Sequence, residues 1–429
     1  MLKKKSLILI FVGIGIISSL VVIVGSENTD FSSILIENNP KSEVKISGFE
    51  KNHGFFKESI AGNLEDDLLE FVNGKQSLKI TTNGDGEEVI IRKDNILPKI
   101  DFDERFLKTW IKISDVKKIS GLKISISGDN FDSFKTYWIH KNNTSPSAIN
   151  FRNNQWNPLT ISLTQTDHNA VNISSIDSVS ISLADKSTGS VSVWFDELSL
   201  GKNYDKGILT FTFDDAPDTQ YTNALPILAK YDFSATSYVP TNWIDKSDRL
   251  STNELKELQD VYGWDVSAHT LNHIDLSNPL YEDQFEKELY QSKQFLLDNG
   301  FKKGADHFAY PFGTFDNNFS MQLVKKYYKT ARGVIGDTET LPVADQYRLR
   351  VMYISNFTEP IDVSKRVQDA IENGDWLILV FHGIVESNAN DRHATYLMSN
   401  FEQIVDDIYS KGIQVMTVSE VYNKILNAN

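Results

Sequence analysis

Residues 207–215 read GILTFTFDD, an apolar run that ends abruptly in two adjacent carboxylates. A continuous apolar segment of this length is typical of a strand buried on both faces of a parallel sheet. Beyond it, strand-like segments alternate with helical patterns to the end of the chain. This alternation predicts a parallel sheet or (β/α) barrel with helices outside, and residues 205–429 suffice for one such barrel.

The expected elements of this region follow from its changing hydrophobic period. The strands are predicted at 207–213, 235–239, 264–268, 307–310, 349–353, 376–381 and 414–417. The helices are predicted at 224–230, 253–260, 281–299, 320–328, 363–373, 394–411 and 418–426. A short polar linker at 202–206 precedes them.

Upstream of this linker, apolar and polar residues alternate with the period of short β-strands. Alternating or β-branched segments are separated by turn-rich stretches such as NGDG at 83–86. About eight or nine strands without a long helix predict an antiparallel, jelly-roll-like sandwich, placed at residues 30–201. The expected strands are 77–81, 88–92, 108–113, 122–126, 136–140, 159–163, 179–183 and 191–200.

This upstream region has features of a sugar-binding module. The segment VWFDEL at 193–198 loosely resembles the last strand of jelly-roll carbohydrate-binding modules. Trp110, Tyr137, Trp138 and Trp156 are candidates for stacking on sugar rings. The alternative is that these aromatics belong to the core and that the module is a structural spacer.

The first 26 residues carry an export pattern. Three lysines at 3–5 precede an apolar run at 7–24, which is long enough to cross a bilayer. We therefore predict a signal anchor or a signal peptide at residues 1–26, with the remaining chain at the cell surface or outside the cell. Sequons begin at Asn142, Asn143, Asn172, Asn318 and Asn356.

The amino-acid composition of the chain argues against several classes of function. The 429 residues contain 43 basic and 58 acidic side chains, which gives a formal net charge of −15. Such a chain repels phosphate backbones, so we expect no nucleic-acid partner. There is no cysteine, which excludes disulfides, thiolate metal sites and a cysteine nucleophile. Any bound metal must be held by histidines and carboxylates.

Polar residues collect where the predicted strands of the barrel end. Asp214-Asp215 follow the first strand, and His269 and His273 follow the third. Pro311-Phe312-Gly313 and His382-Gly383 follow two others. Catalytic residues of (β/α) barrels gather at this edge of the sheet.

The spacing of His269 and His273 suits a divalent metal. At positions i and i+4, two imidazoles are expected to share one face of a helical turn. A carboxylate from the Asp214-Asp215 pair would complete three ligands, and the other carboxylate would remain free as a base. The alternative for the acidic pair is a helix N-cap, because Pro217 follows closely.

At these residues the chain resembles the polysaccharide deacetylases, also called NodB-homology or carbohydrate esterase family 4 enzymes. The resemblance covers roughly 206–426 and rests on TFDD at 212–215, HTLNH at 269–273 and VFH at 380–382. It implies that Asp214 is the general base, that Asp215, His269 and His273 hold the metal, most often Zn²⁺, and that His382 is the general acid.

The third family motif is similar to FAYPFG at 308–313. By resemblance, the backbone N–H of Phe312 stabilises the oxyanion, and Tyr310 and Pro311 are expected to bind substrate. The usual arginine of this motif is replaced by Tyr310, as in the branch that acts on poly-β-1,6-N-acetylglucosamine. A fourth motif is not evident, and Arg348 or Arg350 is a candidate for the missing charge beside the base.

The expected function is metal-dependent removal of N-acetyl groups from an extracellular polysaccharide. A different class remains open, namely a surface protein that binds glycan without catalysis. An O-acetyl esterase would use the same residues. A glycoside hydrolase would use paired carboxylates but leaves the histidine pair without a role.

Overall fold

The computed structural model describes residues 43–141, 151–163, 166–167, 171–315, 319–334, 336, 338–387 and 394–427. The predicted N-terminal segment, residues 1–26, and the sequons at 142, 143 and 318 lie outside them. Across the described residues, no helix is long and apolar enough to cross a membrane.

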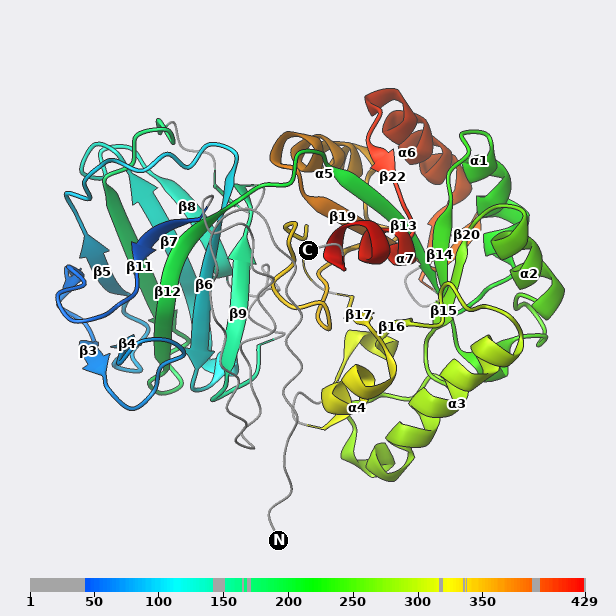
Figure 1. Ribbon diagram of the computed structural model, residues 1–429, viewed down its shortest axis with the longest axis horizontal. Coiled ribbons are helices and arrows are strands. Elements are labelled where there is room, and N and C mark those ends of the chain that lie inside the picture. The colour runs from blue at the N-terminus through cyan, green and yellow to red at the C-terminus, as the bar shows by residue number, and fades with distance from the viewer. Residues whose placement is uncertain are drawn as a thin grey trace, which may run out of the picture. The chain divides into compact units, whose positions relative to one another are not determined.

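The predicted sandwich is confirmed as two antiparallel sheets that share a hydrophobic core (Figure 1). One sheet has the order β3-β4-β12-β6-β9, and β1 also pairs with β12. Its strands are β1 (Val44–Ser47), β3 (Asn63–Asp67), β4 (Ser77–Thr81), β6 (Arg105–Ile113), β9 (Trp156–Ile161) and β12 (Ser192–Lys202). The other sheet has the order β10-β8-β7-β11-β5-β2. Its strands are β2 (Phe56–Lys57), β5 (Val89–Lys93), β7 (Ile119–Ser127), β8 (Lys135–Lys141), β10 (Thr166–Asp167) and β11 (Ser178–Asp185).

The candidate sugar-stacking aromatics of the sandwich have unequal access to solvent. Trp110 and Tyr137 are 5% and 0% exposed and pack in the interior, which contradicts a stacking role for both. Trp138 is half-buried, and the ammonium groups of Lys123 and Lys141 lie 5.3 and 4.8 Å from its ring centroid. Trp156 on β9 is also partly exposed, so the stacking prediction stays open for Trp138 and Trp156 alone.

The C-terminal part contains the predicted parallel sheet, in the order β17-β16-β15-β14-β13-β19-β18, with β22 beside β13. Its strands are β13 (Ile208–Asp214), β14 (Ala235–Val239), β15 (Asp265–Ala268), β16 (His307–Ala309), β17 (Thr330–Arg332), β18 (Met352–Tyr353), β19 (Trp376–Phe381) and β22 (Gln414–Val415). Strands β17 and β18 end the sheet, so it is an open, distorted barrel rather than a closed one. A short separate pair consists of β20 (Gly383–Val385) and β21 (Thr395–Leu397).

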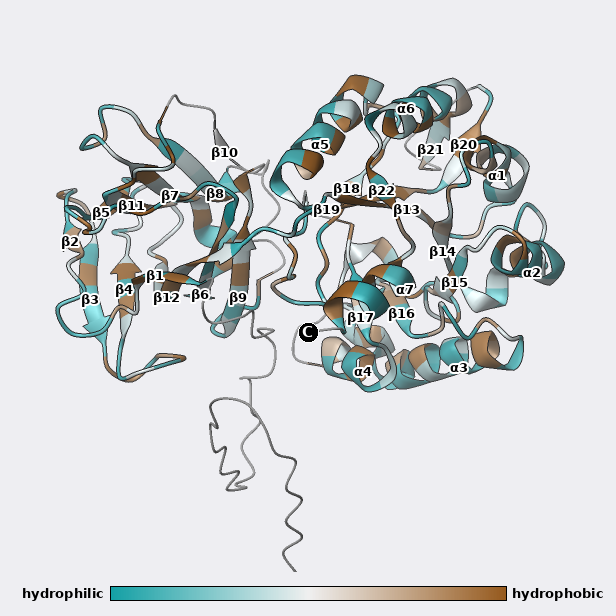
Figure 2. Cartoon of the chain, turned by 45° about the horizontal axis from the view of Figure 1, so that its top comes forward, coloured by the Kyte–Doolittle hydropathy of each residue, from teal (hydrophilic) through white to brown (hydrophobic). Residues whose placement is uncertain are grey.

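Seven helices connect and cover these strands among the described residues. They are α1 (Leu225–Ala229), α2 (Thr252–Asp260), α3 (Phe285–Asp298), α4 (Ser320–Tyr327), α5 (Pro360–Asn373), α6 (Met398–Lys411) and α7 (Val418–Val421). Local signals set their ends: Ser251 and Glu254 form a capping box at the start of α2, and Gly374 ends α5 with φ of 65°. Figure 2 shows apolar (brown) segments along β13 and β19, which pair side by side in the sheet.

Candidate active site

The carboxyl ends of β13, β15 and β19, and the turn after β16, surround one cavity. Its volume is about 730 Å³. The lining includes six of the residues singled out in the sequence, namely Asp214, Asp215, His269, His273, Phe312 and His382. The parallel topology explains this gathering, because the carboxyl ends of neighbouring strands meet at the same edge of the sheet.

Three of these side chains form a compact set of potential metal ligands. The ligand atoms of Asp215, His269 and His273 all lie within 4.8 Å of one another. Asp215 Oδ1 lies 3.2 Å from His273 Nε2 and 3.6 Å from His269 Nε2. This oxygen is buried and makes no hydrogen bond within the described residues, so the donor set fits a divalent cation.

The electrostatics of Asp215 favour its charged form. Burial acts to raise the pKa of Asp215, but the nearby imidazoles, His273 foremost, outweigh it and lower this pKa below its ordinary value. Asp215 and Ala216 both have positive φ, 67° and 51°, so the chain turns sharply as it leaves β13. The turn points the two neighbouring carboxylates in different directions, Asp214 toward Arg332 and Asp215 toward the histidines.

His269 is held in one tautomer by the neighbouring strand. Its Nδ1 lies 2.7 Å from the carbonyl oxygen of Ala309, and this contact leaves Nε2 facing Asp215. The side chain is 2% exposed, and burial lowers the pKa of His269 to about 4. A neutral imidazole with a hydrogen-bonded Nδ1 has the form that metal ligation requires.

His273 reaches the cluster by a route that the spacing did not predict. Residues 269–273 form a loop and not a helical turn, with positive φ at Thr270 and His273. Buried Glu288 of α3 fixes this loop, because its Oε2 accepts hydrogen bonds from the backbone N–H groups of Leu271 (3.0 Å) and Asn272 (2.8 Å). Glu288 is a supporting residue that the sequence pattern did not reveal.

The charge beside Asp214 comes from Arg332, the last residue of β17. The two side chains are 1% and 0% exposed and form a short buried ion pair. Arg348 and Arg350, the predicted candidates, pair instead with Asp345 and Glu339. The prediction was wrong because β17 has three residues, TAR, too few to show a strand period.

Phe312 lies at the mouth of the cavity in a strained turn. Its φ is 60°, its side chain is 58% exposed, and its ring lies 4.5 Å from that of His273. Gly313 follows with φ of 69°, and a Cβ at this position would lie 2.4 Å from Val334 Cγ2, so glycine is required here. The turn itself is closed by the N–H of Gly313 on the Tyr310 carbonyl at 2.9 Å.

Tyr310 and Pro311, which the sequence predicted to bind substrate, begin the turn that carries Phe312. Both are buried, and neither lines the cavity. The Tyr310 hydroxyl donates to the Tyr347 carbonyl at 3.2 Å, and its ring packs 4.4 Å from that of Phe315. Through these interior contacts, Tyr310 anchors the turn that carries Phe312.

His382 follows β19 and faces the cavity beside Tyr353, with ring centroids 5.6 Å apart. Its Nδ1 is buried and has no hydrogen-bond partner within the described residues. The nearby Asp375 lies before the opposite end of β19 and accepts a hydrogen bond from Ser162 at 2.6 Å.

Two further residues shape the cavity wall. The guanidinium of Arg249 lies 4.4 Å from the ring centroid of Trp243, and its Nη1 donates to the Asp215 carbonyl at 2.8 Å. The Trp243 ring lies 5.0 Å from that of His273. Two aromatic rings, those of Trp243 and Phe312, thus pack against His273 at the cavity wall.

Comparison with known proteins agrees with this geometry. The sequence model described as polysaccharide deacetylase matches residues 201–331, which include the three candidate metal ligands and end just before Arg332. Poly-beta-1,6-N-acetyl-D-glucosamine N-deacetylase of Staphylococcus aureus (strain MSSA476) is 32% identical over 135 residues, 29% of this chain and 46% of the relative. The enzyme of the same name from Staphylococcus epidermidis (strain ATCC 35984) is 29% identical over 165 residues, 36% of this chain and 56% of the relative.

The matches thus span about half the length of these curated relatives. Among solved structures, the Xyl-CE4 domain of a multidomain xylanase from the hindgut metagenome of Trinervitermes trinervoides aligns with a TM-score of 0.36. Its sequence identity is 18%, and the alignment covers 51% of this chain and 91% of that domain. On sequence, residues 201–331 of the chain match the polysaccharide deacetylase family.

Proposed function

We propose that this protein is a metal-dependent deacetylase that removes N-acetyl groups from a polymer of N-acetylhexosamine. The observation that carries the proposal is the meeting of Asp214, His382 and the Asp215-His269-His273 cluster around one cavity. The curated relatives are named for poly-β-1,6-N-acetyl-D-glucosamine, and we propose a substrate of that class.

Asp215, His269 and His273 would hold the cation, for which we propose Zn²⁺. When bound, a divalent cation polarises the acetyl carbonyl and lowers the pKa of a water molecule toward about 7.

The other residues of the cavity handle protons and charge. Asp214 accepts the proton of the attacking water, with its carboxylate oriented by Arg332. The backbone N–H of Phe312 donates to the developing oxyanion, an interaction worth about 3–4 kcal/mol in the transition state. His382 protonates the leaving amine, so that acetate and a free amino sugar are the products.

We also propose that the catalytic domain works at the cell surface. The support is the export pattern of residues 1–26, three lysines followed by an apolar run. A polymer substrate outside the cell agrees with this location.

Acetate release tests the function directly. The purified chain would be offered poly-β-1,6-N-acetylglucosamine, chitin oligomers, peptidoglycan and O-acetylated xylan. We expect release from an N-acetylated polymer, its loss on chelation, and its recovery with zinc or cobalt. Turnover indifferent to chelation would contradict the metal mechanism, and release from the O-acetylated polymer alone would identify an esterase. Glycan binding without acetate release would identify a binding protein.

A further inference from the structure

Strand β9 lies at the edge of its sheet, yet its polar groups are buried. Asn157, Thr160 and Ser162 of this segment are 0%, 2% and 0% exposed. An edge strand normally presents its unpaired backbone groups to water or to another chain. Here the covering surface comes from the C-terminal part of the chain, which lies in the same compact unit and whose side chains bond to Thr160 and Ser162.

Arg350 covers the backbone of this edge strand. Its Nη1 donates to the Thr160 carbonyl at 3.0 Å, and Nη2 lies 3.3 Å from Thr160 Oγ1. Glu339 accepts from the same guanidinium at 2.9 and 3.0 Å, so the buried charge is paired. Thr340 adds a hydroxyl contact to Thr160 Oγ1 at 2.7 Å.

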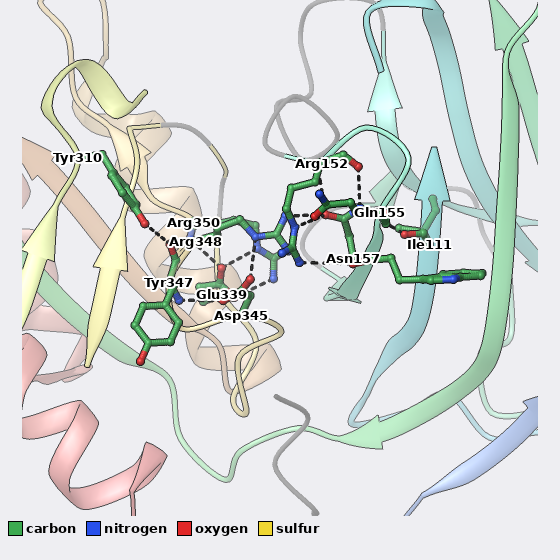
Figure 3. A network of polar contacts seen from close by, with 11 residues as sticks. Ile111, Arg152, Gln155, Asn157, Tyr310, Glu339, Asp345, Tyr347, Arg348 and Arg350 are labelled. Atoms are coloured by element: carbon green, nitrogen blue, oxygen red, sulfur yellow. Dashed lines mark hydrogen bonds and ion pairs between the residues drawn. The ribbon is translucent and has the colours of Figure 1, made fainter. Parts of the chain in front are cut away.

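Two further contacts extend this surface. Arg348 donates to Asn157 Oδ1 at 3.1 Å and to Asp345 Oδ2 at 2.8 Å (Figure 3). Ser162 donates to Asp375 at 2.6 Å. Removing one partner from a buried, hydrogen-bonded charge pair is costly, so these contacts favour one fixed arrangement over free movement.

The segment that carries these arginines also reaches the active site. The N–H of Leu349 donates to the Ala331 carbonyl at 3.0 Å, directly beside Arg332. The same segment continues into β18, whose Tyr353 packs against His382. The sandwich contacts therefore hold the chain that borders both the base and the proposed acid.

We infer that the β-sandwich is a fixed structural part of the catalytic unit, in which β9 positions residues 339–353 and through them Arg332 and Tyr353. The sandwich thus supports the active site through the residues that border it. It is not a tethered module that recruits glycan. The catalytic half of this inference rests on the proposed function. The docking half does not.

Cleavage of the linker tests the docking without an activity measurement. A protease site inserted between Asp205 and Lys206, both exposed, allows the intact chain to be cut after folding. We expect the two pieces to elute together in gel filtration and to separate only in denaturant. Separation under native conditions would overturn the inference, whatever activity the pieces keep.

Arg350→Met tests the positioning. We expect kcat to fall about tenfold or more with KM changed less than about threefold, and Arg350→Lys to restore part of kcat. Arg366→Met on α5 is the control, since Arg366 forms a partly exposed ion pair with Asp369 of the same helix. Thermal unfolding would verify that each variant is folded at the assay temperature.

A rise in KM with kcat unchanged would overturn the positioning role, because loss of a glycan-recruiting module weakens binding alone. An unchanged kcat would overturn it as well. If the parent chain released no acetate, the proposed function would fail, while the cleavage experiment would still decide the docking.

Discussion

Arg332 and Asp214 form a buried ion pair although three strands, β16, β15 and β14, separate their own strands in the sheet. The guanidinium lies 4.5 Å from the ring centroid of Tyr238 on β14. The pair therefore crosses the inner face of a strongly curved sheet, and the curvature brings the edge strand β17 opposite the interior strand β13. An arginine outside the expected motif thus reaches the proposed base.

Replacing Arg332 should weaken both stability and catalysis. Arg332→Met leaves the Asp214 carboxylate buried without a partner, so we expect the free energy of unfolding to fall by about 3–5 kcal/mol. Urea denaturation measures this change. The double variant Asp214→Asn/Arg332→Met removes both charges and should recover part of the stability but no deacetylation. Equal stability of the parent and the single variant would argue against the ion pair.

Substitutions of the adjacent residues Asp214 and Asp215 should have different effects on metal binding and on acetate release. Asp214→Asn keeps the shape of the side chain and leaves the Asp215-His269-His273 cluster intact, so metal binding should persist while acetate release falls at least about 100-fold. Asp215→Asn should instead weaken binding of the metal. Calorimetry with Zn²⁺ and an acetate assay distinguish the two. Near-normal turnover in Asp214→Asn would disprove its role as the base.

Glu288 should control metal affinity from outside the ligand set. Its carboxylate holds the N–H groups of Leu271 and Asn272, which precede His273. Glu288→Ala frees this loop, and we expect metal affinity to drop about 10–100-fold, the usual effect of losing a group that supports a ligand. Competition with a chelating dye measures it. Glu282→Ala, an exposed change before α3, is the control and should leave affinity unaltered.

The sequence predicted most of the fold because its elements have clear periods. Strands β14 (Ala235–Val239) and β19 (Trp376–Phe381) lie where the apolar runs placed them, since buried parallel strands read as continuous apolar segments. Strand β17 was not predicted, and β18 is shorter than the predicted strand at 349–353, because two or three residues carry no period.

The candidate site was predictable as a set of residues but not as an arrangement. The histidine spacing indicated a cluster, yet its loop depends on Glu288, which lies fifteen residues beyond His273 on another element. The source of the charge beside Asp214 depends on sheet curvature, which no local pattern encodes. Tyr310 was expected to bind substrate only because its motif resembles that of the family, and the packing of the folded chain shows that its side chain is buried.

A buried histidine away from the cluster should make stability depend on pH. His307 of β16 is 1% exposed, and its Nδ1 lies 2.8 Å from Thr330 Oγ1. Burial lowers the pKa of His307 to about 4, while Asp265 and Asp306 favour its charged form and Lys329 and Lys293 oppose it. The folded protein thus keeps the imidazole neutral where an unfolded chain would protonate it.

Proton uptake by the unfolded chain sets the direction in which stability changes with pH. Between pH of about 6.5 and about 4 the unfolded chain binds more protons at this site, so the free energy of unfolding decreases as pH falls through that window. The full loss for one such group is about 3 kcal/mol. Chemical denaturation at pH 7, 5.5 and 4.5 in the presence of a chelator measures the slope, to which His269 adds in the same sense. His307→Gln should flatten the dependence, and an unchanged slope would show that His307 titrates alike in the folded and unfolded protein.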